Sequence, residues 1–132
     1  MSKNKGFSLV ELIIVIAIMA VLIGLLSPQF LKFVKNSKVV ADVSNAASIA
    51  DCINATIMDN GTVDATIQGT GGTTLTGIQG LSKLPNSKVD KNYEWVIKSN
   101  STEGVTEITL GDVKIYPGGD TNNEYYAAHY SN

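Results

Sequence analysis

Apolar and polar positions follow different patterns along the chain, and the first pattern is an almost unbroken apolar run. Residues 7–26 contain one charged side chain, Glu11. A helix of this length spans about 30 Å, which matches the hydrocarbon thickness of a bilayer. The preceding residues 1–6 are basic through Lys3 and Lys5, which favours a cytoplasmic N-terminus. The run therefore predicts a helix that is apolar enough to span a membrane, with the rest of the chain outside the cell.

Three interpretations of the apolar run compete. A secretory signal peptide needs a small-x-small cleavage site after the apolar core, and residues 25–29 (Leu-Leu-Ser-Pro-Gln) match that pattern poorly. An ordinary membrane anchor has Glu11 as its weak point, because a carboxylate in the apolar stretch costs several kcal/mol unless it is paired or protonated. The third interpretation gives Glu11 a function within the apolar segment. The alternative is that Glu11 has no function and is tolerated because its carboxylate reaches the membrane surface.

A second pattern begins after the run and predicts an amphipathic helix. Its apolar positions are spaced alternately four and three residues apart, which places them on one helical stripe: Val39, Val43, Ala46, Ala50, Ile53 and Ile57. Lys35, Lys38, Asp42, Asn45 and Asp59 fall mostly off this stripe. A helix from Phe7 to about Met58 would be about 78 Å long. We therefore expect a lollipop shape, in which half the helix protrudes and half packs on a small head, with Asn60-Gly61 as the stop.

The long helix has a weak point at Gly24 and Pro28. Proline removes one backbone hydrogen bond and clashes with the carbonyl four residues earlier, which here belongs to Gly24. We expect a kink or local melting at this point. The alternative is a helix that ends at Ser27, with Pro28 opening a second helix.

The third pattern is an alternation that predicts a small sheet. Alternating segments at 93–98, 105–110 and 113–116 are joined by short turns, which favours a three-stranded antiparallel meander. One face should cover the amphipathic helix and give an α+β head, with Trp95 in the core. The Thr- and Gly-rich segment 62–80 has weaker alternation around Ile67 and allows short edge strands. Its Gly69-x-Gly71 lacks the strand–helix context of a phosphate loop and predicts a solvated connection.

The last residues form a polar tail with several rings. One reading is an exposed aromatic surface for adhesion or subunit contact, and the other is a segment docked on the head by its rings. His129 has no partner triad or ligand set in the sequence, so neither catalysis nor metal binding is indicated. The tail residues concerned are Tyr125, Tyr126, His129 and Tyr130.

The amino-acid composition argues against several classes of function. The chain has 132 residues with 10 lysines, no arginine and 12 acidic residues, so a binder that neutralises nucleic-acid phosphates is disfavoured. Its single cysteine, Cys52, permits no internal disulfide and no cysteine-based zinc site, and we read it as a small half-buried helix residue. The mean hydropathy of +0.11 is an average over two unlike parts, a strongly apolar helix and an acidic head.

The segment Lys5-Gly6-Phe7-Ser8-Leu9-Val10-Glu11, followed by the apolar run, resembles the class III signal peptide of type IV pilins and related pseudopilins. The resemblance implies cleavage between Gly6 and Phe7 by a membrane aspartic peptidase, and N-methylation of Phe7. It also implies extrusion into a helical filament by a cytoplasmic assembly ATPase and a membrane platform protein. Many Gram-negative pilins have a disulfide near the C-terminus, and its absence here fits a Gram-positive source.

The chemistry of Glu11 suits such a filament. Cleavage would leave a cationic amine on Phe7 at the helix N-terminus, about one turn before Glu11. In a staggered bundle, the Phe7 amine of a neighbouring copy would reach Glu11. A pair across two chains would fix the axial register, because a slip leaves buried charges unpaired at several kcal/mol.

These observations predict a leader (1–6), an apolar membrane or filament-core helix (7–28), an amphipathic helix packed on the head (29–59) and a globular head (60–132). We interpret the chain as a structural pilus subunit, a major pilin without enzymatic activity or cofactor. It would be stored in the cytoplasmic membrane and assembled into an extracellular homo-oligomeric filament for adhesion or twitching motility. The alternative is a minor pseudopilin of a type II secretion or competence system.

Overall fold

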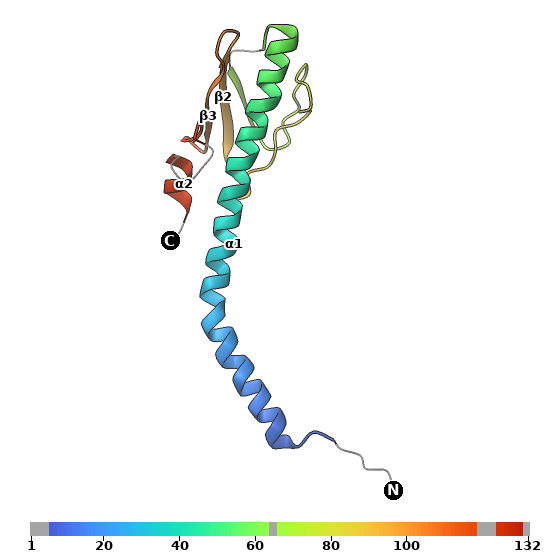
Figure 1. Ribbon diagram of the computed structural model, residues 1–132, viewed down its shortest axis with the longest axis vertical. Coiled ribbons are helices and arrows are strands. Elements are labelled where there is room, and N and C mark those ends of the chain that lie inside the picture. Colours follow the sequence, from blue (N-terminus) through green and yellow to red (C-terminus); the bar gives the residue numbers. More distant parts are fainter. Residues whose placement is uncertain (1–5, 64–65, 119–123, 131–132) are drawn as a thin grey trace. The chain divides into compact units, whose positions relative to one another are not determined.

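The computed structural model describes residues 6–63, 66–118 and 124–130. The chain divides into two compact units, Met1–Val34 and Lys35–Asn132. The predicted α+β class is confirmed, since one long helix is followed by an antiparallel sheet and a short second helix (Figure 1). In chain order the elements are α1 (Leu9–Asn60), β1 (Thr66–Thr70), β2 (Glu94–Asn100), β3 (Gly104–Leu110), β4 (Val113–Tyr116) and α2 (Glu124–His129).

Helix α1 is continuous over 52 residues and contains Pro28. The alternative of a helix end at Ser27 is therefore wrong, because the helix continues on both sides of the proline. The predicted stop is confirmed: Gly61 has φ 79° and its N–H donates to the carbonyl of Ile57 at 2.7 Å. This left-handed conformation is one that glycine adopts without steric cost, which explains why α1 ends here.

Among the described residues the sheet has four strands, in the order β1-β2-β3-β4, with every neighbouring pair antiparallel. The three predicted strands are present, but the predicted count of three is corrected by β1 at one edge. β1 pairs with β2 through Ile67 opposite Ile97. Its alternation was a weak sequence signal because the strand is short and rich in threonine and glycine, so the pairing partner decides its structure.

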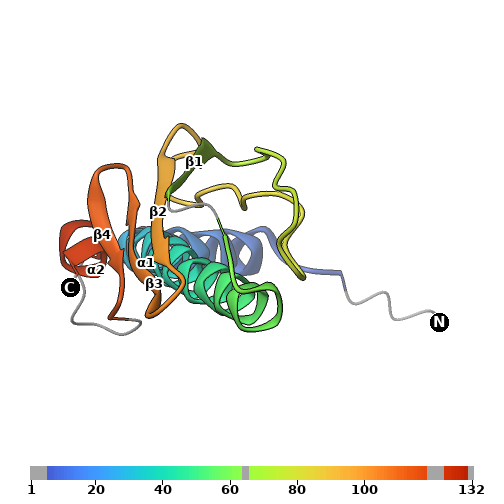
Figure 2. The same ribbon diagram turned by 90° about the horizontal axis from the view of Figure 1, so that it is seen from above.

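The core of the second unit lies between the C-terminal half of α1 and one face of the sheet (Figure 2). All six residues of the predicted helical stripe are buried, and Ile49 joins them. Trp95 is fully buried as expected, and its indole Nε1–H donates to the carbonyl of Pro85 at 2.8 Å. Ile97 and Ile108, opposite each other on β2 and β3, cover the same core.

A side chain of α1 fixes the start of β3. The Asn54 side-chain oxygen Oδ1 accepts the backbone N–H of Val105 at 2.8 Å. Gly104 has φ 80°, and an added Cβ there would clash with the amide of Asn54. Only glycine therefore allows the β2–β3 turn to approach α1 so closely.

Candidate functional site

The N-terminus of α1 is closed by a reciprocal pair of hydrogen bonds between Ser8 and Glu11. The Ser8 N–H donates to Glu11 Oε2 at 3.3 Å, and the Glu11 N–H donates to Ser8 Oγ at 3.2 Å. This is a capping box, in which two of the unpaired N–H groups of a helix start are satisfied. The sequence reasoning missed it, although Ser-x-x-Glu in front of an apolar run is its usual signal. The helix therefore begins at Leu9 and not at Phe7.

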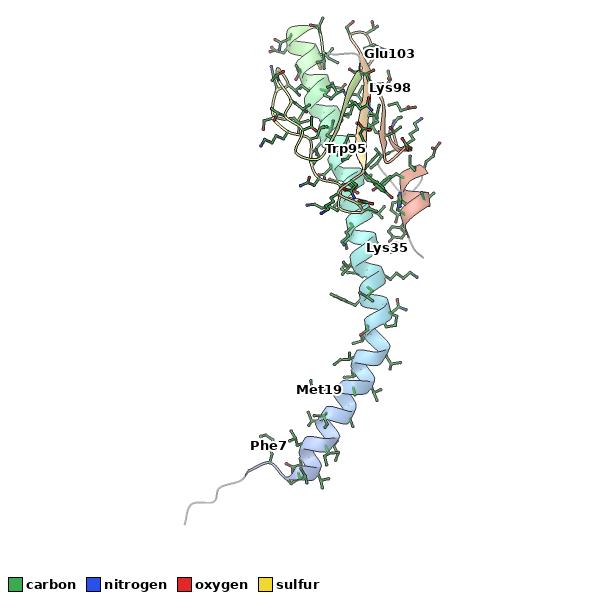
Figure 3. All side chains as sticks on the ribbon, turned by 180° about the vertical axis from the view of Figure 1, so that it is seen from behind. Phe7, Met19, Lys35, Trp95, Lys98 and Glu103 are labelled. Atoms are coloured by element: carbon green, nitrogen blue, oxygen red, sulfur yellow. The ribbon has the colours of Figure 1, made fainter. Side chains whose placement is uncertain are left out.

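Gly6 and Phe7, the predicted processing residues, precede this cap in a segment without regular structure (Figure 3). The Phe7 side chain is 93% exposed. Unwound, accessible backbone is what a peptidase requires of a scissile bond. The described geometry is thus compatible with the predicted cleavage position.

The first unit exposes its apolar side chains. The helix is long and apolar enough to cross a membrane, and none of its most apolar window is buried by the rest of the chain. Exposure of a contiguous apolar surface this long marks a membrane or protein interaction site. Among the large apolar residues 50% or more exposed are Leu12, Ile16, Met19, Leu22 and Leu26.

The turn before Pro28 contains an additional hydrogen bond from a side chain. The Ser27 hydroxyl donates to the carbonyl of Ile23 at 2.6 Å. Such back-bonding of a serine to the preceding turn is known to accompany helix bends. Gly24 lies in the same turn and has open space around its Cα. The predicted kink at Gly24 and Pro28 stays a prediction.

A buried carboxylate, Asp42, joins three elements of the second unit. The expectation that Asp42 lies off the core stripe is wrong, since the residue is 0% exposed. It accepts the Ser87 hydroxyl (2.7 Å), the backbone N–H of Lys88 (2.7 Å) and of Val89 (3.2 Å), and the Tyr125 hydroxyl (2.7 Å). A buried carboxylate without a cation is tolerated when it receives several donors. No local sequence pattern indicates this arrangement, because the four donors come from segments far from α1 in the chain.

The C-terminal tail is docked on the head through the ring of Tyr125. For this residue, the interpretation of a docked segment is confirmed. Helix α2 was not predicted, and its Tyr125 is fully buried. Burial and the hydrogen bond to Asp42 raise the pKa of the Tyr125 hydroxyl, which keeps it protonated as a donor. His129 lies next to this ring, with centroids 4.5 Å apart, and 5.8 Å from the ring of Tyr93. Burial and the charge of Lys35 lower the pKa of His129, and Asp42 partly opposes them.

The two remaining tail rings are stacked on each other. Tyr126 and Tyr130 have centroids 4.0 Å apart with an interplanar angle of 17°. Burial and the Tyr130 hydroxyl raise the pKa of Tyr126 to about 12. Both side chains are half-buried, so neither presents a fully exposed aromatic surface.

Other candidates have structural explanations. Cys52 is a free, half-buried thiol on α1, as predicted. Asn54-Ala55-Thr56 matches the N-glycosylation pattern, but Asn54 accepts the N–H of Val105 in β3, and Thr56 is buried with its hydroxyl accepting the N–H of Gln79 at 2.9 Å. In the part of the chain that the structure describes, no group of three or more histidine, cysteine, aspartate or glutamate residues is placed to hold a metal ion.

Comparison with known proteins agrees with the N-terminal geometry. Residues 1–27 match the model of the prokaryotic N-terminal methylation motif. The chain is also 30% identical over 93 residues to the type IV major fimbrial protein FimA of Dichelobacter nodosus. Together these findings support a type IV pilin. The aligned part covers 70% of this chain and 56% of its relative, so the chain spans about half the length of the curated relative it matches. No solved structure matches this chain.

The matched motif and the apolar helix agree with each other. An N-terminal methylation motif followed by an exposed apolar helix fits a membrane-anchored precursor.

Proposed function

We propose that this chain is the structural subunit of a type IV pilus, cleaved between Gly6 and Phe7 and assembled into a helical extracellular filament. The capped apolar helix carries the proposal, because its exposed side chains need a membrane before assembly and other copies after it. The proposed partners are a prepilin peptidase that also methylates Phe7, an assembly ATPase and a platform membrane protein. The filament would act in adhesion or twitching motility.

Glu11 would set the axial register of the filament. In the isolated chain its carboxylate accepts the Ser8 N–H, which partly satisfies it before assembly. Cleavage would create a cationic amine on Phe7, and the amine of a second copy offers the carboxylate a charged partner. An ammonium donor adds the attraction between two opposite charges, which the neutral Ser8 N–H does not supply and which is strong in an apolar bundle, so the intermolecular pair is favoured.

Gly24 and Pro28 would supply local flexibility to the same helix. The carbonyl of Gly24 receives no N–H from Pro28, since proline has none. We assign to this turn the kink or local melting that packing of many copies requires.

N-terminal analysis of surface material tests the proposal. Mass spectrometry of filaments sheared from cells should find this chain abundant and starting at an N-methylated Phe7. A start at Met1, or beyond Leu26, would contradict the processing site. A chain that is missing from sheared material and stays in the envelope would favour a minor pseudopilin of a type II secretion or competence system. A clean deletion strain should lose the filaments in negative-stain microscopy.

Substitution of Glu11 separates its two roles. Glu11→Gln keeps the capping box, because glutamine serves at the same position, but removes the charge. Glu11→Ala and Glu11→Leu remove both. All three variants should accumulate in the membrane, and all three should reduce sheared filament yield by about tenfold or more if the charge sets register. Normal yield from Glu11→Gln would refute the charged pair.

A further inference from the structure

The charges of α1 are separated along the helix in an unusual order. Between Glu11 and Asp42, the charged residues are all lysines: Lys32, Lys35 and Lys38. From Asp42 to the end of α1, they are all aspartates: Asp42, Asp51 and Asp59. The helix macrodipole acts only within the first and last turns, where it favours Glu11 and disfavours Asp59, so it does not account for the order of the charges in the middle of the helix. The next question is therefore which of these charges have partners.

Two of the three aspartates have partners within the chain. Asp42 receives four donors in the core, and Asp59 accepts the Gln79 side-chain N–H at 2.6 Å. Asp51 is exposed and has no hydrogen bond or ion pair among the described residues. The three lysines also form no ion pair there; the one salt bridge in the described part of the chain joins Lys98 and Glu107 at 3.3 Å.

Asp51 lies on a stripe of α1 that faces away from the core. We call this set, whose members are three or four residues apart, the outer stripe: Val40, Ser44, Ala47, Asp51, Ala55 and Met58. Val40 is 51% and Met58 is 88% exposed, and the residues between them are small apart from Asp51. Exposed apolar residues at both ends and small residues between them allow a second helix to approach closely. Asp51 is the single charge on this surface.

We propose that Asp51 of one copy forms an ion pair with the lysine block of a second copy, Lys32, Lys35 or Lys38, packed against the outer stripe. The inference rests on the proposed filament function and adds a contact distinct from that of Glu11. Within the second unit, Lys35 and Lys38 lie about 20 to 24 Å from Asp51 along α1, at 1.5 Å per residue. Parallel copies shifted by that distance bring opposite charges together, whereas unshifted copies place like charges side by side.

The charges favour a second copy of this chain as the partner that covers the outer stripe. The two blocks belong to the same helix and are complementary to each other, so no other molecule is needed to satisfy them. The contact uses two different surfaces, the outer stripe and the lysine block. Such a heterologous contact repeats into an open helical assembly instead of closing as a dimer.

Charge reversal in cells that assemble the full chain tests the pair. Asp51→Lys should leave the amount of mature subunit in the membrane unchanged and reduce sheared filaments by about tenfold or more, because it places like charges together. Glu94→Lys makes the same charge change at an exposed position of β2 and should leave the yield unchanged. In the Asp51→Lys background, one of Lys32→Asp, Lys35→Asp or Lys38→Asp should restore filaments to within about threefold of wild type. Failure of all three to restore them would overturn the proposal.

A milder variant covers the case in which Asp51→Lys does not fold. Asp51→Asn removes this charge and leaves the Glu11 contact in place, so the stability of its purified filaments should depend less on salt than that of wild type between about 0.05 and 0.5 M. Wild-type filaments should weaken over that range, because salt screens ion pairs. Equal salt dependence of the two would overturn the pair. If wild-type cells make no filaments that contain this chain, the proposed function itself fails. Wild-type filaments together with normal Asp51→Lys filaments refute only the ion pair.

Discussion

Removing the hydroxyl of Tyr125 tests whether the bond to Asp42 holds the C-terminal helix on the head. Tyr125→Phe keeps the buried ring and its packing, and deletes one donor to the buried carboxylate. Asp42 would still accept the Ser87 hydroxyl and the two backbone N–H groups of Lys88 and Val89. The substitution therefore isolates the contact between α2 and α1 from the rest of the hydrogen-bond network.

The magnitude follows from the burial and length of this bond. The Tyr125–Asp42 distance is 2.7 Å, and both residues are fully buried. A hydrogen bond to a charged group contributes about 1.5 to 3 kcal/mol, so we expect a loss of about 2 kcal/mol in the free energy of unfolding of the second unit. For a domain of roughly 100 residues, this corresponds to a fall in Tm of about 8 to 16 °C.

Trp95 provides the assay. It is the single tryptophan of the chain and is fully buried, so its fluorescence reports unfolding of the head while α1 dominates the helical signal. Thermal and urea unfolding of the full chain in detergent should show the loss for Tyr125→Phe. The matched control, Tyr126→Phe, removes a hydroxyl from the half-buried neighbouring ring and leaves the donors of Asp42 unchanged, so it should cost less than Tyr125→Phe.

The outcome that refutes the reasoning is a Tyr125→Phe loss no larger than that of Tyr126→Phe. A double-mutant comparison adds a second check. If the Tyr125 hydroxyl acts through Asp42, adding Tyr125→Phe to Asp42→Ala should cost little more than Asp42→Ala alone. Fully additive losses would show that the hydroxyl stabilises the head through another group.

Two further predictions concern the same head. The pKa of His129 is lowered in the folded chain, so its stabilising contribution is present above about pH 6.5 and is lost as the pH falls through the folded pKa. The Trp95-monitored Tm should therefore fall between pH 7 and pH 5 (approximate limits), and His129→Gln should flatten that slope; parallel pH curves for the two proteins would contradict it. Gly104→Ala should cost more than about 2 kcal/mol in urea unfolding, because it combines a positive φ with a clash against Asn54. Gly72→Ala, at φ 87° in open space, should cost about 1 kcal/mol, and equal losses would rule out the clash.

The helix and most of the sheet were predictable because their signals are local. The apolar run and the four-three spacing of Val39 to Ile57 specify α1 directly, since side chains that share a helical face recur with that period. The strands β2, β3 and β4 alternate strongly and are joined by short turns, so their pairing follows from chain order. The capping box at Ser8 and Glu11 was also readable, although it was missed.

The sequence by itself determined a capped apolar helix, a processing motif and an α+β head. The tertiary structure alone decided the burial of Asp42, the docking of α2 through Tyr125 and the pairing of β1 with β2. These features depend on contacts between residues far apart in the chain, such as Tyr125 and Asp42. A polar side chain such as Asp42 reads as solvent-facing in a local pattern, because burial becomes favourable only when distant segments supply its hydrogen-bond donors.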